Sequence, residues 1–370
     1  MSVAFLNLQR LHAELDAPLS EAVLRALRSG YYIGGPEVEA FEGAFAAYCG
    51  ATYCVGVGNG LDALHLALRA LCVGAGDEVI VPSNTFIATW LAVSQVGARC
   101  VPVEPDDGDF QIDPARIEAA ITVRTKVIIP VHLYGHPADL EAIGAIARRH
   151  GLAVLEDAAQ AHGALYRGRR IGGHGNIVAW SFYPGKNLGA IGDGGAVTCD
   201  DPALAEKLRL LRNYGSRERY RNEVPGYNSR LDPIQAAVLA TKLPALDRWN
   251  ARRQAIAARY QAAFADTALT LPKVRDSVEP VWHLYCVRHP QRDRLRALLA
   301  EAGIETLIHY PIPPHLQIAY ADLGLKPGAL PIAEQMSAQL CSLPIDPTME
   351  DSDVEQVIAA VRGALAMLAA

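Results

Sequence analysis

Residues 177–195 read IVAWSFYPGKNLGAIGDGG, and the rest of the chain is organised around this stretch. The apolar run Ile177–Phe182 predicts a buried strand, and the Pro-Gly pair at 184–185 is a turn signal that ends it. Lys186 follows the turn with no other cation nearby, among glycines that let the backbone turn sharply and let a ligand come close. Such a lysine can form a Schiff base with a carbonyl compound once burial lowers its pKa. The alternative is a solvated lysine in a surface loop.

Strand-like runs and helical patterns alternate on both sides of this stretch. The helical patterns lie at 61–72, 85–96, 114–121 and 137–150. Strands that alternate with helices of this length predict βαβ units. The expected fold is therefore α/β, with a mostly parallel seven-stranded sheet. The expected strands are Tyr53–Val57, Glu78–Val81, Arg99–Val103, Lys126–Val131, Leu152–Glu156, Ile177–Phe182 and Gly195–Thr198.

The pattern changes after about Pro202. We expect a helix at 202–212, a long helix from Leu231 to about Phe264, and then a small α/β unit. Its expected strands are Trp282–Arg288 and Glu305–Tyr310, and its expected helices lie at 291–302, 331–340 and 351–368. We place a domain boundary near residue 245, giving a large cofactor-binding domain (1–245) and a small C-terminal domain (246–370). A second domain against a sheet usually creates a cleft in which ligands bind.

Composition excludes several classes of protein. The 370 residues are 51% hydrophobic and 20% charged, as expected for a globular protein of one or two domains. A formal net charge of −6 without a cluster of five Lys or Arg argues against nucleic acid as the main partner. No apolar run approaches the length of a membrane span, and the first 16 residues lack a signal-peptide core. The seven cysteines are scattered without a CxxC pair, so we expect reduced thiols in a cytoplasmic protein and no metal site.

A glycine-rich turn at 54–64, CVGVGNGLDAL, joins an expected strand to an expected helix. Main-chain amides at such a helix N-terminus bind phosphate well. A dinucleotide fingerprint is excluded because Leu61 occupies its third glycine position. We therefore expect a single phosphate to be bound by the amides near Gly60, Leu61 and Asp62. The alternative is a tight turn without a ligand.

Two adjacent acids end the expected strand at 152–156, in the stretch LEDAAQAHG at 155–163. Strand side chains alternate between faces, so only one of Glu156 and Asp157 can point into a site. Ligands of open α/β sheets bind at the carboxyl ends of strands, where a carboxylate can hold a pyridinium nitrogen protonated and make the ring an electron sink. Gln160 could reach a ring hydroxyl oxygen. His162 could be either structural or functional.

These three features form one constellation. Lys186 lies 29 residues after Asp157 (186 − 157), beyond the next expected strand, and the phosphate-binding turn lies upstream. An acid, a lysine and a phosphate site together predict a phosphate-bearing aromatic aldehyde held by the lysine.

The sequence resembles the DegT/DnrJ/EryC1/StrS family of pyridoxal-phosphate-dependent sugar aminotransferases over nearly its whole length. This resemblance implies the fold type I, aspartate aminotransferase-like architecture. Among the members it is closest to the dTDP-3-keto-6-deoxyhexose 3-aminotransferases. The matching blocks are SGYYIGG at 29–35, GDEVIVP at 76–82, VHLYG at 131–135, EDAAQAHG at 156–163, SFYPGKN at 181–187, NYG at 213–215, NSRLD at 228–232 and IHYP at 308–311.

The resemblance implies pyridoxal 5'-phosphate as cofactor, with pyridoxamine 5'-phosphate as the intermediate form. Lys186 would be the Schiff-base lysine and the proton carrier, and Asp157 would pair with the pyridine nitrogen. Gln160 would contact the ring hydroxyl, Phe86 would stack on the ring, and Ser181 would join the turn amides on the phosphate.

The resemblance also implies a homodimer with shared active sites. Asn228 would reach the phosphate of the neighbouring subunit's cofactor. Tyr183, His309 and Tyr310 would lie beside the nucleotide-linked keto sugar. Leu61 departs from the commonest family pattern, which has a hydroxyl residue there, so any contact from it must be main-chain.

The implied reaction is transfer of an amino group from L-glutamate to a keto carbon of a nucleotide sugar. A few relatives replace the lysine with histidine and are sugar dehydratases, whereas Lys186 is intact. The block at 59–64, NGLDAL, resembles members that act at C-3 of dTDP-3-keto-6-deoxyhexoses, and Asp62 separates it from the SGTAAL type of members that act at C-4. The alternatives are a 4-keto or UDP-linked sugar, or a non-catalytic regulatory homologue, which would have lost the lysine or the acid.

A nucleotide diphosphate needs cationic or amide partners near the mouth of the site. The sequence offers arginines at 217, 219, 221 and 230, which could equally be solvated. Asp62, at the start of the helix expected to form the floor of the site, could accept a hydrogen bond from a sugar hydroxyl.

Overall fold

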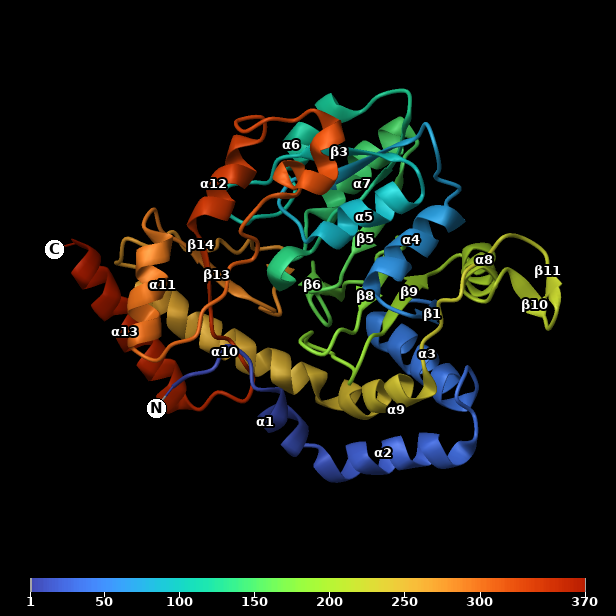
Figure 1. Cartoon of the computed structure of the whole chain (residues 1–370), viewed down its shortest axis with the longest axis horizontal. Coiled ribbons are helices and arrows are strands. Elements are labelled where there is room, and N and C mark those ends of the chain that lie inside the picture. Colours follow the sequence, from blue (N-terminus) through green and yellow to red (C-terminus); the bar gives the residue numbers. More distant parts are fainter. Residues whose placement is uncertain (1, 370) are drawn as a thin grey trace.

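The computed structural model describes residues 2–369. A seven-stranded sheet lies between two layers of helices, and a smaller unit formed by the C-terminal part of the chain lies to one side, at the left of Figure 1. The strand order is β1-β9-β8-β5-β4-β2-β3. Strand β9 is antiparallel to both of its neighbours, and the remaining pairs are parallel. The strands are β1 (Tyr53–Val57), β2 (Glu78–Pro82), β3 (Arg99–Val103), β4 (Thr125–Ile128), β5 (Ala153–Asp157), β8 (Ile177–Ser181) and β9 (Gly195–Cys199).

Side-chain alternation along the strands explains the layers. In β2, Val79 and Val81 face a core formed with helices α4, α5 and α8, whereas Ile80 faces a core formed with α6 and α7. Helices α3 and α9 cover the second face at the β8–β9 end. The helices are α1 (Leu8–Ala13), α2 (Asp16–Ser29), α3 (Pro36–Cys49), α4 (Gly60–Ala70), α5 (Ile87–Gln95), α6 (Pro114–Ile117), α7 (Leu140–His150), α8 (Pro202–Arg212) and α9 (Pro233–Lys242).

The C-terminal unit has its own core, in which helices pack around a two-stranded antiparallel sheet. The N-terminus joins it, because Val3 is buried in this core and pairs with Ile304. The next residues, Phe5 and Leu6, line the cavity described below. The elements of this unit are α10 (Leu246–Phe264), β13 (Tyr285–Arg288), α11 (Arg292–Glu301), α12 (Pro331–Gln339), β14 (Leu340–Leu343) and α13 (Asp351–Ala369).

Short strands complete the described elements. Strands β6, β7 and β12 form a three-stranded sheet, and β10 and β11 form a hairpin that projects at the right of Figure 1. Their bounds are β6 (Leu165–Tyr166), β7 (Arg169–Arg170), β10 (Ser216–Glu218), β11 (Arg221–Asn222) and β12 (Val278–Glu279).

Two expectations about the C-terminal half were wrong. The long helix is divided into α9 and α10 by a 3₁₀ turn at Leu243–Ala245, because Pro244 has no N–H for the helical ladder. Residues 305–310 form no strand. Only Leu307 pairs, with Ser342 of the unexpected strand β14, and the prolines at 311, 313 and 314 cannot donate to a continued ladder.

No helix within residues 2–369 combines the length and the apolar character needed to cross a bilayer. All seven cysteines are free thiols, and Cys72 alone among them is exposed.

The aromatic core between α3 and β8 supports a stability prediction. The Phe45 ring is fully buried and packs nearly perpendicular to the rings of Trp180 and Phe182, at centroid distances of 5.2 Å to each. Phe45→Ala should lower the free energy of unfolding by about 3–5 kcal/mol, because it leaves a cavity. Urea denaturation of the cofactor-free protein measures this. The control is Val123→Ala, since Val123 is 97% exposed. A loss no larger than the control's would contradict this packing.

Candidate active site

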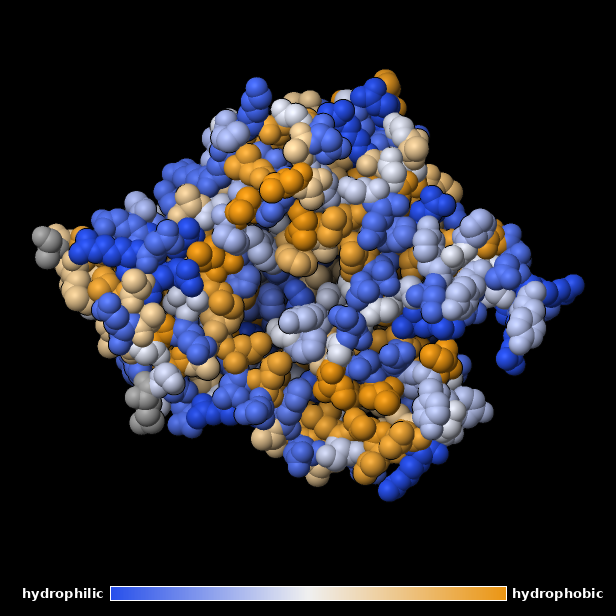
Figure 2. Space-filling model, in the orientation of Figure 1, coloured by the Kyte–Doolittle hydropathy of each residue, from blue (hydrophilic) through white to orange (hydrophobic). Residues whose placement is uncertain are grey.

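A cavity of about 870 Å³ lies where the carboxyl ends of the parallel strands meet the C-terminal unit. We call it the sheet-edge cavity. The space-filling view is hollowed near its centre, where hydrophobic side chains border the depression (Figure 2). The cavity brings together most of the residues predicted from the sequence, namely Gly60, Leu61, Phe86, Asp157, Gln160, Ser181, Tyr183, Lys186, His309 and Tyr310. Asp62 and Asn228 do not line it.

The loop after β8 holds Lys186 at the cavity wall. The Lys186 amide donates to the Tyr183 carbonyl across the Pro-Gly turn at 2.8 Å. Gly189 packs so closely on the backbone of Pro184 that a side chain there would clash. Buried Lys242 donates to the Gly189 carbonyl at 2.7 Å and anchors the loop to α9. The loop is therefore held from both sides, and the lysine side chain can extend only along a limited path.

The amine of Lys186 has a lowered pKa. Part of the side chain faces the cavity, but protein surrounds the amine on its other sides. Desolvation by burial lowers the pKa from 10.5 to about 8, although the nearby carboxylate of Asp157 acts in the opposite direction. A neutral amine is the nucleophilic form, so this shift prepares Lys186 to attack a carbonyl carbon near neutral pH.

Asp157, rather than Glu156, faces the cavity. The Asp157 carboxylate accepts a hydrogen bond from the Thr89 hydroxyl at 2.9 Å and lines the cavity. Glu156 points to the other face, where its oxygens meet Nε2 of His132 at 2.8 Å and the amide of Asn176 at 2.7 Å. Because the Ala138 amide donates to Nδ1 of His132, Nε2 carries the proton and donates to Glu156. The alternation expected along the strand has therefore separated the two acids.

Gln160 links the cavity wall to the C-terminal unit. Its Oε1 accepts from the Tyr134 amide at 2.6 Å, so its Nε2 is directed toward the Tyr310 hydroxyl, 3.2 Å away. The Tyr134 hydroxyl in turn donates to the main-chain carbonyl of His309. Burial lowers the pKa of His309 to about 4, with Lys186 contributing, so its ring is neutral at pH 7. The Phe86 ring lies 5.3 Å from that of Tyr310.

The start of α4 and the end of β8 are in direct contact. A Cβ on Gly60 would lie 2.5 Å from the Ser181 Cβ, so only glycine permits this approach. Asn59 caps the helix by accepting from the Asp62 amide at 2.8 Å. The amides of Gly60 and Leu61 remain as first-turn donors without helical acceptors. Together with the Ser181 hydroxyl they form a cradle that fits a phosphate.

Asp62 lies outside the cavity. Its amide is already engaged by Asn59, and its carboxylate accepts from the Ser229 hydroxyl at 2.7 Å. Both groups therefore already have partners within the chain, and a contact of Asp62 with a phosphate or sugar stays a prediction. Leu61 lines the cavity as expected for a main-chain contact.

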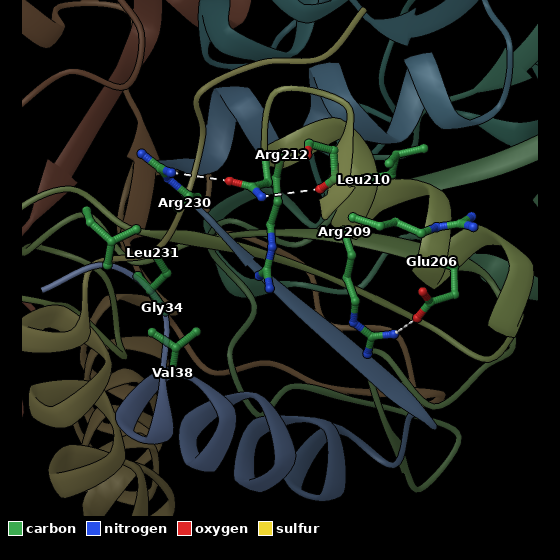
Figure 3. Close-up of a pocket in the computed structure, with 12 residues that line it drawn as sticks. Gly34, Val38, Glu206, Arg209, Leu210, Arg212, Arg230 and Leu231 are labelled. Atoms are coloured by element: carbon green, nitrogen blue, oxygen red, sulfur yellow. Dashed lines mark hydrogen bonds and ion pairs between the residues drawn. The ribbon is translucent and has the colours of Figure 1, made fainter. Parts of the chain in front are cut away.

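Asn228 and the four arginines lie away from the sheet-edge cavity. Asn228 is exposed and pairs with Asn213 at the edge of a second cavity of about 520 Å³, which Arg230 lines (Figure 3). Arg217 and Arg221 pair with Glu223 and Glu218, and Arg219 lies over the ring of Tyr220. Arg230 donates to the Asn213 side chain at 3.2 Å. Within one chain, these residues are not brought to the site.

His162 is a core residue. Its ring is buried among Phe45, Trp180 and Phe182, with centroid distances of 5.3–6.4 Å, and burial lowers its pKa to about 3. The sequence left open whether His162 is structural or functional, and its place in the core shows that it is structural.

Several residues at the cavity were not predicted from the sequence. Thr85, Arg253 and His283 line the cavity, and Thr89 contacts Asp157 from behind the wall. Thr85 and Thr89 follow β2, but Thr85 lies before the N-cap of α5, so helical spacing does not relate the two residues. His283 and Arg253 carried no local signal, because the fold of the C-terminal unit brings them in.

The Gly60 cradle gives a testable prediction. Gly60→Ala should weaken binding of pyridoxal 5'-phosphate about tenfold or more, because the added methyl group displaces Ser181. Absorbance titration of the apoenzyme measures this, with phosphate-free pyridoxal as a comparison that should change much less. Gly43→Ala on α3 is the matched control, since its Cβ would meet nothing within 4 Å. Equal cofactor affinity in wild type and Gly60→Ala would refute the cradle.

The shifted pKa of Lys186 gives a second prediction. The rate at which the apoenzyme forms a Schiff base with pyridoxal 5'-phosphate should rise with pH and level off above about 8, because the neutral fraction of the amine then saturates. Stopped-flow absorbance measures this rate. The reaction of free pyridoxal 5'-phosphate with butylamine is the reference, because it shows how ionisation of the cofactor itself changes the rate with pH. Lys186→Ala should give no such signal. A midpoint near 10.5 would show that burial does not shift this amine.

The family to which this chain belongs is shown by comparison with known proteins. Residues 14–362 match the DegT/DnrJ/EryC1/StrS aminotransferase family. The chain is 57% identical to the erythromycin biosynthesis sensory transduction protein EryC1 of Saccharopolyspora erythraea, over 98% of this chain and 99% of that protein. It is 55% identical to a dTDP-3-amino-3,4,6-trideoxy-alpha-D-glucose transaminase of Streptomyces venezuelae, over 97% and 95%.

A solved structure agrees with this assignment. The crystal structure of S. venezuelae DesV in complex with a ketimine intermediate superimposes with a TM-score of 0.97, at 55% identity and 98% coverage of both chains. The protein therefore belongs to the DegT/DnrJ/EryC1/StrS family and is a pyridoxal-phosphate-dependent aminotransferase with the fold type I architecture.

Proposed function

We propose that this enzyme transfers the amino group of L-glutamate to the C-3 keto group of a dTDP-linked 3-keto-6-deoxyhexose. The product would be an amino-deoxysugar for a surface polysaccharide or a glycosylated natural product. The observation that carries this proposal is that Lys186, with its lowered pKa, and Asp157 meet in one large cavity. The S. venezuelae relative, whose name specifies a dTDP-3-amino sugar, supports the choice of C-3.

The proposal gives roles to four of the cavity residues, Asp157, Gln160, Phe86 and Lys186. Pyridoxal 5'-phosphate, when bound, supplies an aldehyde that carries the amino group and a ring that accepts electron density. Asp157 would hold a proton on the ring nitrogen, and Gln160 would donate to the ring hydroxyl oxygen. Phe86 would cover one ring face. The Nζ atom of Lys186 would hold the aldehyde carbon, with loss of the carbonyl oxygen as water, until the amine of the substrate displaces it. The freed amine would then carry protons to and from the reacting carbons.

The lining of the cavity supports a deoxysugar. Much of the wall is aliphatic, and burying an unpartnered hydroxyl against such a wall is costly. A sugar with a methyl group at C-6 and fewer hydroxyls loses less on entering. Tyr183, His309 and Tyr310 would supply the polar contacts. The aliphatic residues of the wall are Leu6, Leu61, Leu64, Ile87, Ala88, Leu91, Val131, Leu133, Ala159, Leu284, Leu307 and Ile345.

The proposal includes a cytoplasmic homodimer. Exposed apolar side chains on α2 and the loop after it form a surface that a second copy could cover: Leu24, Leu27, Tyr31, Tyr32 and Ile33 are 43–59% exposed. Figure 2 shows hydrophobic side chains gathered over the lower edge, where Figure 1 places α2 and α9. Asn228 would then reach the partner's cofactor phosphate.

The division into a large domain, 1–245, and a small domain, 246–370, is also part of this proposal.

Isotope transfer tests the reaction. The holoenzyme is incubated with ¹⁵N-labelled glutamate and either the 3-keto or the 4-keto dTDP-6-deoxyhexose, each made enzymatically. We expect ¹⁵N at C-3 of the first sugar and little product from the second, because the depth at which the hexose enters sets which carbon meets the amine at about 3–3.5 Å. NMR locates the new amine.

The controls separate the reaction class from the position. Lys186→Ala should bind cofactor yet lose multiple turnover. If only the 4-keto sugar gives labelled product, amination at C-3 is refuted, but the assignment as an aminotransferase still holds. The UDP-linked 3-keto sugar, tested in parallel, decides the nucleotide. The absorbance of the bound cofactor reports whether the holoenzyme takes the amino group from glutamate. If that absorbance is lost with glutamate but no sugar receives the amino group, a sugar is not the acceptor.

A further inference from the structure

The carboxylate of Asp157 lies at the end of a chain of two threonine hydroxyls. The Thr89 hydroxyl is 2.9 Å from Oδ2 of Asp157 and also 2.9 Å from the hydroxyl of Thr85. Both threonines are at most 2% exposed, and Asp157 is 5% exposed. Thr85 lines the sheet-edge cavity, whereas Thr89 does not. The chain of hydroxyls therefore runs from the cavity wall to the back of the carboxylate.

The direction of these hydrogen bonds follows from the number of protons. An ionised carboxylate only accepts, so Thr89 donates its single hydroxyl proton to Asp157. Thr89 then has no proton left for its other contact, and Thr85 must be the donor to Thr89. On the other carboxylate oxygen, Oδ1, the Ala159 amide donates at 3.2 Å. Both oxygens therefore receive protein donors, and Oδ1 keeps a lone pair for a ligand.

The surroundings of Asp157 show what these donors must offset. Burial raises the pKa of this carboxyl above its ordinary value, which favours the neutral acid. The groups that oppose burial are the Thr89 hydroxyl, the Ala159 amide, the Lys186 amine and His132. A hydrogen bond to a charged acceptor is roughly twice as strong as one between neutral groups. Thr89 therefore stabilises the ionised form more than the neutral acid.

The local fold explains the position of both hydroxyls. Thr89 lies in the first turn of α5, and Thr85 lies just before the extended N-cap residue Phe86, where the entering chain brings the two hydroxyls to 2.9 Å. The Trp90 indole donates to the Pro82 carbonyl at 2.9 Å and ties α5 to the carboxyl end of β2. Thr89 is thereby directed at the carboxyl end of β5, two strands away across β4.

We propose that Thr89, supported by Thr85, is a positioning residue that orients Asp157 and keeps it ionised, so that the cofactor's ring nitrogen stays protonated. The proposal rests on the role given to Asp157 in the proposed function. Thr85 and Thr89 have no role in the proposed function. The proposal gives them a part in the reaction that they exert through Asp157, without touching the reacting carbons.

The test uses the holoenzyme reconstituted with pyridoxal 5'-phosphate labelled with ¹⁵N in the ring, because its NMR shift reports protonation of that nitrogen directly. In Thr89→Val, which keeps the shape and removes the hydroxyl, we expect the resonance to move toward the neutral pyridine position. The first half-reaction with glutamate, followed by stopped-flow absorbance, should slow by about ten- to a hundredfold. Thr89→Ser should restore both readouts, and Thr85→Val should show a smaller change in each.

Controls separate the possible failures. Thr241→Val removes a helical threonine hydroxyl on α9 that bonds to a main-chain carbonyl, and it should change neither readout. A folded Thr89→Val with a wild-type ring resonance and half-reaction rate would overturn the proposal. If Thr89→Val does not fold, a Thr85→Val variant with both readouts unchanged overturns it instead. In Asp157→Asn the nitrogen should become neutral; a proton retained there would refute the role of Asp157 rather than that of the threonines.

Discussion

The site depends on holding one carboxylate and one amine in a buried wall. Desolvation acts on both in the same sense, because it favours the neutral form of each: it raises the pKa of Asp157 and lowers that of Lys186. Their mutual attraction opposes this effect. Asp157 receives additional donors, whereas no hydrogen bond to the Lys186 amine is present among the described residues. The protein thus supports the charged form of the acid and leaves the amine closer to its reactive neutral form.

This asymmetry explains much of the surrounding architecture. Because β5 and β8 are parallel neighbours, Asp157 and the loop that carries Lys186 emerge at the same edge of the sheet. The antiparallel strand β9 then returns the chain, and the loop at 182–194 that joins β8 to β9 must be tightly packed to hold Lys186 in place. Close approaches at Gly189 and Gly195, where added side chains would meet backbone atoms, allow that packing. The glycines around the lysine therefore serve the backbone of the loop as well as access for a ligand.

The sequence predicted features that depend on local pattern. All seven sheet strands, the lysine after its Pro-Gly turn, and the glycine turn were predicted, because alternation and turn residues encode them, whereas the place of Ser181 beside that turn was expected only from the family resemblance. The sequence did not decide which of Glu156 and Asp157 points into the site, because this depends on which face of the strand lies against the cavity. The break at Pro244 was available in the sequence but was outweighed by a continuous helical pattern. Strand β14 follows α12 without any turn residue, and its four residues, Leu-Cys-Ser-Leu, gave no signal of a boundary.

Features that depend on distant segments were beyond a local interpretation. Asp62 begins the right helix, yet the loop containing Ser229 approaches from outside and engages its carboxylate. The consequence concerns how sugar position is selected. The sequence interpretation used Asp62 to distinguish C-3 from C-4 members, but such a residue need not touch the sugar, because Asp62 contacts the segment that contains Asn228 and Arg230. If that segment reaches a partner's site in the proposed dimer, Asp62 would act on the substrate through the position of Ser229 and the residues beside it. Selection between C-3 and C-4 would then be a property of the interface, built by both copies of the chain.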